Sequence, residues 1–173
     1  TTGRANACFN NISGIKTMYI TDDALGTVTY DATDTDVITA FSGTVVFFKF
    51  DLKGNSNTFT ETITKDVSSG TLFFAQSLSV QLPKLTKEMH KELKLICYNS
   101  PRVVIEDYNG NLLILGLLNA CDVTGGTIVS GGGRGDFSGY TLTLTAEEKT
   151  PANFLDDTIV TTGASVSATQ DTP

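Results

Sequence analysis

The sequence TLFFAQSLSVQL at residues 71–82 runs through Pro83 into KLTKEMHKELKLICY at residues 84–98, and this stretch decides the predicted fold. At the end of the first segment apolar residues alternate with serine and glutamine, which is the period of a strand with one buried face: Leu78, Val80 and Leu82. In the second segment apolar residues recur at helical spacing: Leu85, Met89, Leu93, Ile96 and Cys97. The sequence therefore predicts a long strand that leads directly into an α-helix over residues 84–98.

The predicted helix has recognisable ends. Thr86 can cap its first turn, and Glu88 suits the positive N-terminal end of the helix dipole. Pro101 ends it, because proline cannot continue a helix. Lysines and glutamates cover the opposite face, so we expect the apolar face to pack on a sheet, with Cys97 in the core.

The rest of the chain is rich in strand patterns. GYTLTLTA at residues 139–146 alternates cleanly, with Tyr140, Leu142 and Leu144 on one face. Residues 44–52 place Phe48, Phe50 and Leu52 on one face. Further strands are predicted at residues 15–21, 27–30, 37–41, 58–65, 102–107, 111–115 and 121–130. The predicted fold class is mostly β: a β-sandwich or half-barrel of antiparallel strands with one flanking helix.

Turn signals separate these strands. Asn109-Gly110 is the strongest hairpin signal, because both residues tolerate positive φ. A second predicted hairpin loop consists of Lys53, Gly54, Asn55, Ser56 and Asn57, and a glycine-rich inter-strand loop consists of Gly131, Gly132, Gly133, Arg134 and Gly135. We divide the chain into an N-terminal arm at residues 1–13, a domain at residues 14–155, and a C-terminal tail at residues 156–173. The small polar residues of that tail predict a segment that is disordered or docks on a neighbouring subunit.

Composition narrows the function classes. The chain has 173 residues, of which 18% are charged, and its net charge of −7 gives a pI of about 4.5. An acidic surface repels phosphate, so a groove that grips nucleic acid or anionic lipid is disfavoured. We also expect no membrane span and no signal peptide. Cys8, Cys97 and Cys121 are odd in number and widely spaced, which indicates folding in a reducing compartment without disulfides.

Candidate catalytic and metal-binding residues are few. His90 is the only histidine and has no nucleophile motif near it, so a surface or interface histidine is expected. Asp31, Asp34 and Asp36 lack the glycine and distal glutamate of a calcium loop, which favours a solvated turn. The cysteines lack zinc-site spacing. We therefore expect no enzyme activity, no metal and no cofactor.

Three short motifs carry little weight. The glycine-rich loop satisfies neither phosphate-binding pattern, and no helix pattern follows it. Arg134-Gly135-Asp136 spells an integrin tripeptide, but nothing else in the sequence suggests an animal receptor. Asn11-Ile12-Ser13 is a glycosylation sequon, which matters only in a secretory pathway.

Three longer phrases carry a family resemblance: TLFFAQSLSVQLPKL, VVIEDYNGNLLILGLLNACDVTGGTIVSG and GDFSGYTLTLTAEEKTPANFL. Together with the order of elements, they resemble tail-tube and ring virion proteins of tailed bacteriophages, including crAss-like and other phages of Bacteroidetes. The resemblance covers residues 14–155. It implies a homo-oligomer in which six subunits, or a pseudo-sixfold set, join strands edge to edge into rings that stack into a tube.

The resemblance also implies partners and a location. The partners would be other tail or connector proteins, and DNA would only pass through the lumen, without specific binding. The protein would reside in the virion tail after assembly in the host bacterial cytoplasm. The loops Lys53–Asn57 and Gly131–Gly135 would be candidates for contacts between stacked rings.

Alternatives remain open. A head–tail ring or tail-completion protein uses a related fold, and a capsid decoration protein could share the composition. From another class, an adhesin-like binding module could use the Thr- and Ser-rich C-terminal segment as a stalk. A carbohydrate-stacking aromatic cluster would favour that reading, but the sequence has no Trp.

Overall fold

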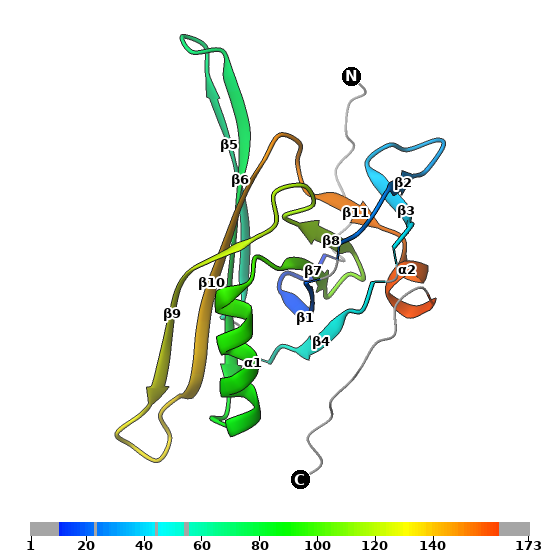
Figure 1. The fold of residues 1–173 in the computed structure, drawn as a ribbon. Helices are drawn as coiled ribbons and strands as arrows, with labels where there is room; N and C mark the ends of the chain where they lie inside the picture. The colour runs from blue at the N-terminus through cyan, green and yellow to red at the C-terminus, as the bar shows by residue number, and fades with distance from the viewer. Residues whose placement is uncertain (1–10, 23, 44, 54–55, 163–173) are drawn as a thin grey trace.

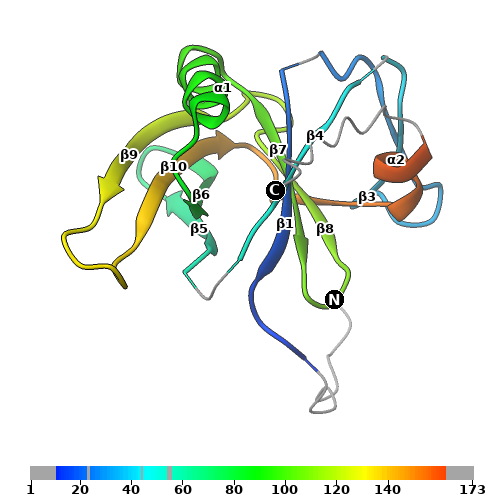
Figure 2. The same cartoon turned by 90° about the horizontal axis from the view of Figure 1, so that it is seen from below.

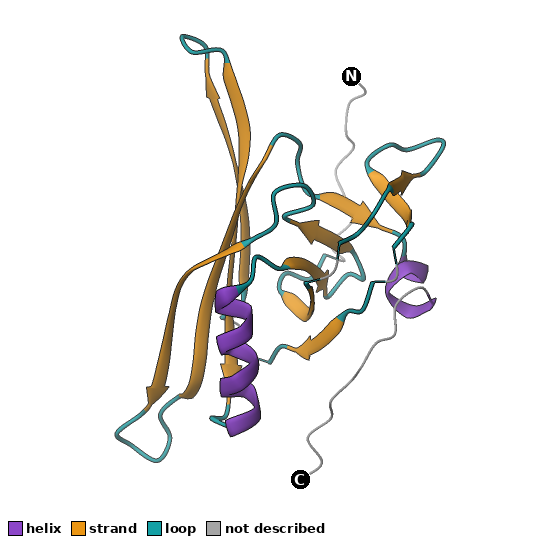
Figure 3. Cartoon of the chain, in the orientation of Figure 1, coloured by secondary structure: helices purple, strands orange, loops and turns teal. Residues whose placement is uncertain are grey.

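Two β-sheets and two helices build the protein (Figures 1 and 3). The computed structural model describes residues 11–22, 24–43, 45–53 and 56–162. A seven-stranded sheet has the order β2-β3-β11-β8-β7-β1-β4, with β1 at Ile15–Thr21, β2 at Val28–Tyr30, β3 at Val37–Phe41, β4 at Phe48–Asp51, β7 at Arg102–Asp107, β8 at Leu112–Leu115 and β11 at Asn153–Leu155. A four-stranded sheet has the order β5-β6-β10-β9, with β5 at Thr58–Asp66, β6 at Thr71–Pro83, β9 at Asp122–Ser130 and β10 at Ser138–Glu148. The predicted fold class, a mostly β sandwich with a flanking helix, is confirmed, although β11 pairs with β3 in parallel.

The first core lies between the two sheets. The alternating side chains of β6 and β10 supply one wall, and the central strands β1 and β7 supply the other. Helix α1, at Lys87–Tyr98, adds Leu93 and Ile96, both 6% exposed. The predicted burial of Leu78, Val80 and Leu82 and of Tyr140, Leu142 and Leu144 is confirmed.

A second core lies on the opposite face of the seven-stranded sheet. Tyr19 of β1, Val104 of β7 and Ile114 of β8 point to this side, where Phe47 and Ile159 cover them. Ile159 belongs to helix α2, at Asp157–Thr162. Figure 2 shows α1 beside the four-stranded sheet and α2 on the far side of the molecule. The central strands of the larger sheet are therefore buried on both faces.

The C-terminal boundary predicted at residue 155 is wrong. Residues 156–162 are ordered: the backbone N–H of Asp156 donates to Ile38 at 2.9 Å, and α2 follows. Ile159 is only 7% exposed. The buried Ile159 side chain docks this turn of helix on the sheet, although the segment is rich in small polar residues. Residues 163–173 of the predicted tail, and residues 1–10 of the predicted N-terminal arm, lie outside the described residues.

The predicted helix begins three residues too early. Thr86 is the N-cap, as expected, and its hydroxyl accepts a hydrogen bond from the N–H of Met89 at 3.2 Å. Leu85 therefore precedes the helix and is exposed, while Met89 is only half-buried. Cys97 is exposed, so its predicted place in the core is wrong. The buried stripe is narrower than the sequence suggested and consists of Leu93 and Ile96.

The strand predicted at residues 44–52 is also shorter, because β4 begins at Phe48. Phe47 is fully buried in the second core, whereas Phe48 is 46% exposed. The apolar run crosses from one core to the other, since Leu52 is buried in the first core. Its alternation therefore does not mark a single buried face.

Buried polar groups fasten the two sheets to each other. The Gln76 side chain on β6 accepts the N–H of Gly116 at 3.1 Å and donates to Glu61 at 3.0 Å. Glu148, only 3% exposed, accepts the N–H groups of Leu118 and Asn119 at 2.9 and 2.8 Å. These bonds give the backbone N–H groups of the loop after β8 hydrogen-bond partners on β6 and β10. Buried polar side chains such as Gln76 and Glu148 need such partners.

We predict that α2 contributes to stability. A chain ending at residue 155 loses Ile159 and should lose about 1.5–3 kcal/mol of unfolding free energy, the usual value for burying one large aliphatic side chain. A chain ending at residue 162 is the matched control. Urea unfolding of both chains measures the difference, and equal midpoints would place α2 outside the folded unit.

We also predict that α1 is anchored by its narrow stripe. Leu93→Asp puts a carboxylate into the first core and should cost at least about 3 kcal/mol, enough to unfold much of the protein. Leu95→Asp on the same helix is the control, because Leu95 is 48% exposed. Circular dichroism and thermal unfolding compare the two variants, and similar losses in both would contradict this packing.

Candidate functional site

The outer face of the four-stranded sheet is lined with hydroxyl groups. Its outward positions alternate with the buried ones, and the ladder register places them side by side: Thr58, Thr60, Thr62, Thr64, Ser77, Ser79, Thr127, Thr141, Thr143 and Thr145. The charged residues at outward positions of these four strands are Asp66, Asp122 and Glu147, all acidic. The outward positions of these strands thus form a wide, polar surface that carries no Lys or Arg.

Both edges of this sheet are long strands. β5 and β9 each have nine residues, and among the described strands each pairs on one side only, with β6 and β10 respectively. An edge strand exposes a row of N–H and C=O groups that can pair with another chain. The hydroxyl face therefore lies between two edges that another copy can extend.

One hairpin projects far beyond the sandwich. The end of the β5–β6 hairpin, residues 62–74, which we call the arm, extends past every other strand in Figure 1. Ile63, Val67 and Leu72 on the arm are 67%, 85% and 49% exposed. Exposed apolar side chains grouped in this way are typical of an interaction surface.

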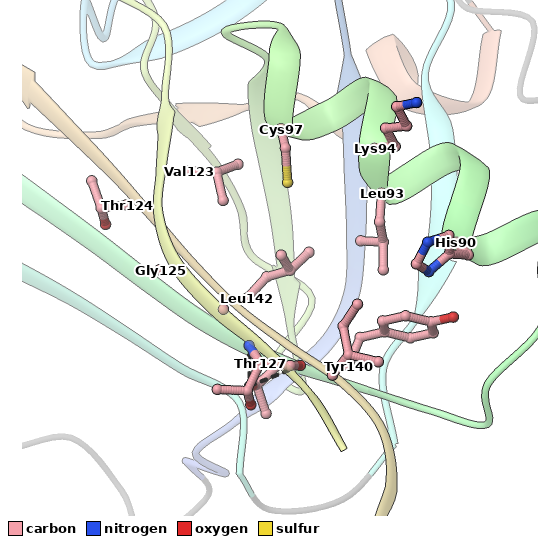
Figure 4. Close-up of a pocket in the computed structure, with 13 residues that line it drawn as sticks. His90, Leu93, Lys94, Cys97, Val123, Thr124, Gly125, Thr127, Tyr140 and Leu142 are labelled. Carbon is pink, nitrogen blue, oxygen red and sulfur yellow. Dashed lines mark hydrogen bonds between the residues drawn. The ribbon is translucent and has the colours of Figure 1, made fainter. Parts of the chain in front are cut away.

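A groove of about 410 Å³ lies between α1, β9 and β10 (Figure 4). Leu93 and Cys97 of α1, Val123 of β9 and Leu142 of β10 line its apolar part. His90 lines one end, with its ring centroid 6.3 Å from that of Tyr140, and Lys94 lies on the same helix. The Tyr140 hydroxyl donates to the carbonyl of Thr86 at 3.2 Å, which fixes the start of α1 against β10.

The predicted hairpin loop at Lys53, Gly54, Asn55, Ser56 and Asn57 is not a hairpin. It joins β4 of the larger sheet to β5 of the smaller one, and Gly54 and Asn55 lie outside the described residues. Asn57 is 6% exposed, and its side-chain oxygen Oδ1 accepts the N–H of Gln81 at 2.9 Å. Asn57 is therefore a structural residue, and of the loop residues that the structure describes, Lys53 and Ser56 are exposed.

The loop with Gly131, Gly132, Gly133, Arg134 and Gly135 joins β9 to β10 and is exposed. Asp136 organises it, because its carboxylate accepts the N–H of Gly133 at 2.6 Å. This loop lies at the end of the four-stranded sheet opposite the arm, and Ser56 and Asn57 lead into β5 at the same end, since Gly139 pairs with Pro83 and Thr58 with Ser79.

The acidic turn is used for backbone hydrogen bonds. Asp31 accepts the N–H groups of Thr33 and Asp34 at 2.7 and 3.1 Å, and these bonds, led by that of Thr33, lower the pKa of Asp31. Asp34 accepts the N–H of Asp36 at 3.1 Å. Among the described residues no cluster of three or more His, Cys, Asp or Glu side chains could hold a metal ion. The geometry matches the turn that the sequence favours.

The comparisons with known proteins add no relative. No protein-family model matches the chain, and no curated protein or solved structure matches it either. Neither helix in the described part of the chain has the length and apolarity needed to cross a membrane.

Sequence reasoning missed the arm and the groove for different reasons. Ser68, Ser69 and Gly70 lie in the turn between β5 and β6, and only the ladder shows that the end of this hairpin extends beyond the sandwich. The groove depends on how α1 packs against β9, which no local pattern encodes. The hydroxyl face could have been found, because threonine recurs at every second position of β5 and β10.

The two cysteines in the described part of the chain should react very differently. Burial, followed by the nearby Glu148 carboxylate, raises the pKa of Cys121 to about 12, so its thiol stays protonated and inaccessible. Cys97 is exposed in the groove. In a Cys8→Ser background at pH 8, we expect a maleimide to label one thiol per native chain and two after denaturation. Mass spectrometry checks this, and native labelling of Cys121 would contradict the packing of the first core.

Proposed function

We propose that this protein is a structural subunit that assembles with copies of itself into rings, as in the tail tube or head–tail ring of a tailed bacteriophage. The observation that carries the proposal is the hydroxyl-lined face of the four-stranded sheet, bounded by two edge strands of equal length that no other described strand pairs with. The sequence resemblance to phage tail-tube proteins points to the same assembly.

The edges supply the lateral contact. Pairing β5 of one copy with β9 of the next continues the antiparallel sheet around a ring and satisfies the edge N–H and C=O groups. Such a contact is heterologous, because each copy uses two different edges. The copies form a closed ring when the rotation between neighbours is a whole fraction of a full turn. A sixfold or pseudo-sixfold ring is the order that the resemblance implies.

The hydroxyl face would line the lumen of such a ring. Its strands carry hydroxyls and carboxylates at their outward positions and no Lys or Arg. DNA binding without sequence preference depends on Lys and Arg contacts to phosphate, so this surface offers DNA no counter-charge. A channel with such a wall passes DNA without holding it.

The remaining proposals follow from this assembly. The partners are copies of the chain and other tail or connector proteins, and the protein resides in the virion after assembly in the bacterial cytoplasm. It is not an enzyme and takes no cofactor. Ser56 and the Gly131–Gly135 loop lie at one end of the sheet, which suits contacts with the next ring.

Negative-stain electron microscopy of the purified chain at high concentration, with native mass spectrometry, tests the proposal. We expect rings or stacked tubes with a central channel and a mass that is a fixed multiple of the 18.4 kDa chain. A strict monomer at every concentration would overturn it and favour a decoration or binding module.

Proline substitution tests the role of the β9 edge. Successive N–H groups of an edge strand alternate between the neighbouring strand and solvent. Of the consecutive variants Ile128→Pro and Val129→Pro, one therefore keeps every internal hydrogen bond of the sheet. That variant should fold, as measured by circular dichroism, but stay a monomer by native mass spectrometry and form no rings. If both variants form normal rings, β9 is not the edge that joins the copies.

A further inference from the structure

Helix α1 presents lysines on the side that points away from the core. Spacings of four and then three residues put Lys87, Lys91 and Lys94 on one side of the helix, opposite its buried residues. All three lysines are exposed. Tyr98 follows Lys94 by one helical turn on the same side and is 79% exposed. We call Lys87, Lys91, Lys94 and Tyr98 the lysine face.

This arrangement of charge is unfavourable for the helix itself. Lys87 and Lys91 are four residues apart, and like charges at that spacing destabilise a helix. The glutamates of α1, Glu88 and Glu92, lie on the flank of the lysine face and are also four residues apart. The ion pairs formed by described residues lie in the seven-stranded sheet, and none of them involves α1. The lysine face therefore has no ion-pair partner in the described part of the subunit.

The far side of the molecule is acidic. Residues 24–48 and 150–162, which include β2, β3, β11 and α2, contain aspartate as their only charged residue type. Figure 2 shows this side, marked by β3 and α2, across the molecule from α1. We call its five aspartates the acidic end: Asp31, Asp34, Asp36, Asp156 and Asp157.

The main chain brings these aspartates together. The N–H of Phe154 donates to the carbonyl of Asp36 at 3.0 Å, which holds β11 and the start of α2 beside the β2–β3 turn. Hydrogen bonds from backbone N–H groups lower the pKa of Asp31 and of Asp156, so both carboxylates are ionised at neutral pH. The acidic end is therefore a fixed group of negative charges.

Both surfaces also expose large apolar side chains beside their charges. On α1, Leu95 is 48% exposed next to the lysine face, which itself contains the exposed Tyr98. At the acidic end, Tyr30 precedes Asp31 and is 41% exposed, and Phe154 is 44% exposed. Aromatic residues are enriched in protein–protein interfaces, whose rims are polar. The two surfaces thus share the composition of an interface and differ in the sign of their charge.

We propose that the lysine face of one copy docks on the acidic end of a second copy. The two surfaces have opposite charge and lie on opposite sides of the molecule, so a single copy cannot join them. The contact is heterologous, because each copy offers one lysine face and one acidic end. Complementary charge steers the copies together and fixes which surfaces meet.

This contact goes beyond the edge pairing of the proposed ring. It uses no residue of β5 or β9, and α1 packs on the core side of the four-stranded sheet, away from the hydroxyl face. Nucleic acid would meet the same lysines, but a subunit with a net charge of −7 repels phosphate as a whole. The acidic end, by contrast, is present once for every lysine face.

Charge reversal followed by mixing tests the contact. Lys87→Glu with Lys91→Glu makes the lysine face acidic, and Asp34→Lys with Asp36→Lys makes the acidic end basic. Each variant alone should associate at least about tenfold more weakly than the native chain, because like charges then meet. An equimolar mixture of the two variants should restore association. Native mass spectrometry and sedimentation measure this at low salt, and high salt should weaken the native contact by screening.

The matched control is Lys49→Glu with Lys149→Glu, which changes the net charge by the same amount at exposed positions outside the lysine face. It should associate like the native chain. Circular dichroism checks that every variant folds. Asp36→Lys alone is the second variant for the acidic end, because it keeps the hydrogen bond from the N–H of Asp36 to the Asp34 carboxylate.

The outcomes separate this inference from the ring proposal. A mixture that associates as weakly as its two components overturns the inference. Unchanged association of Lys87→Glu with Lys91→Glu also overturns it, and rings seen in that variant leave the ring proposal standing. Association that mixing restores, without rings by electron microscopy, supports the inference and overturns the ring proposal. A native chain that stays monomeric at low salt overturns both. DNA binding that the lysine variant loses, with association unchanged, assigns the lysine face to nucleic acid instead.

Discussion

The antiparallel ladder between β6 and β10 is the interaction on which the rest of the structure depends. Ten residue pairs, from Gly139–Pro83 to Glu148–Phe74, hold the two strands in one register. Since side chains alternate across a strand, this register puts Leu78, Val80 and Leu82 into the first core. It puts Ser77, Ser79 and the β10 threonines on the opposite face. A slip of one residue would exchange the two faces, so the core and the hydroxyl surface are specified together.

The seven-stranded sheet gives that ladder a rigid support. Its central strands are buried on both faces, with the four-stranded sheet and α1 on one side and α2 with the segment around Phe47 on the other. The larger sheet, however, supports only part of β6. The half of β6 near Pro83 packs on the core, while the half near Thr71 continues into the arm. The difference in length between the layers leaves the arm exposed.

Local patterns in the sequence account for much of this fold. The bounds of β1 are those predicted. The bounds of β6 and β10 differ from the predicted ones by at most two residues at each end, because strict alternation marks a half-buried strand.

The choice of partner strand is not encoded by local patterns. Residues 53–57 lie between two alternating strands and look like a hairpin loop, yet β4 pairs with β1 and β5 with β6. Cys97 follows the buried Ile96 in the helix, and only the packing of α1 against β9 decides that Cys97 lies in the groove and not in the core. α2 was missed because Ile159 is its single described buried residue in a segment of polar composition.

The composition of the two edges favours assembly over protection. Monomeric sheet proteins usually block long edges with lysine, proline or a covering segment. β5 and β9 together contain one lysine, Lys65, and no proline. Lys65 lies near the tip of the arm, opposite Leu72, so neither lysine nor proline blocks the edge beside the hydroxyl face. Edges left open in this way would aggregate without order unless a defined partner competes for them.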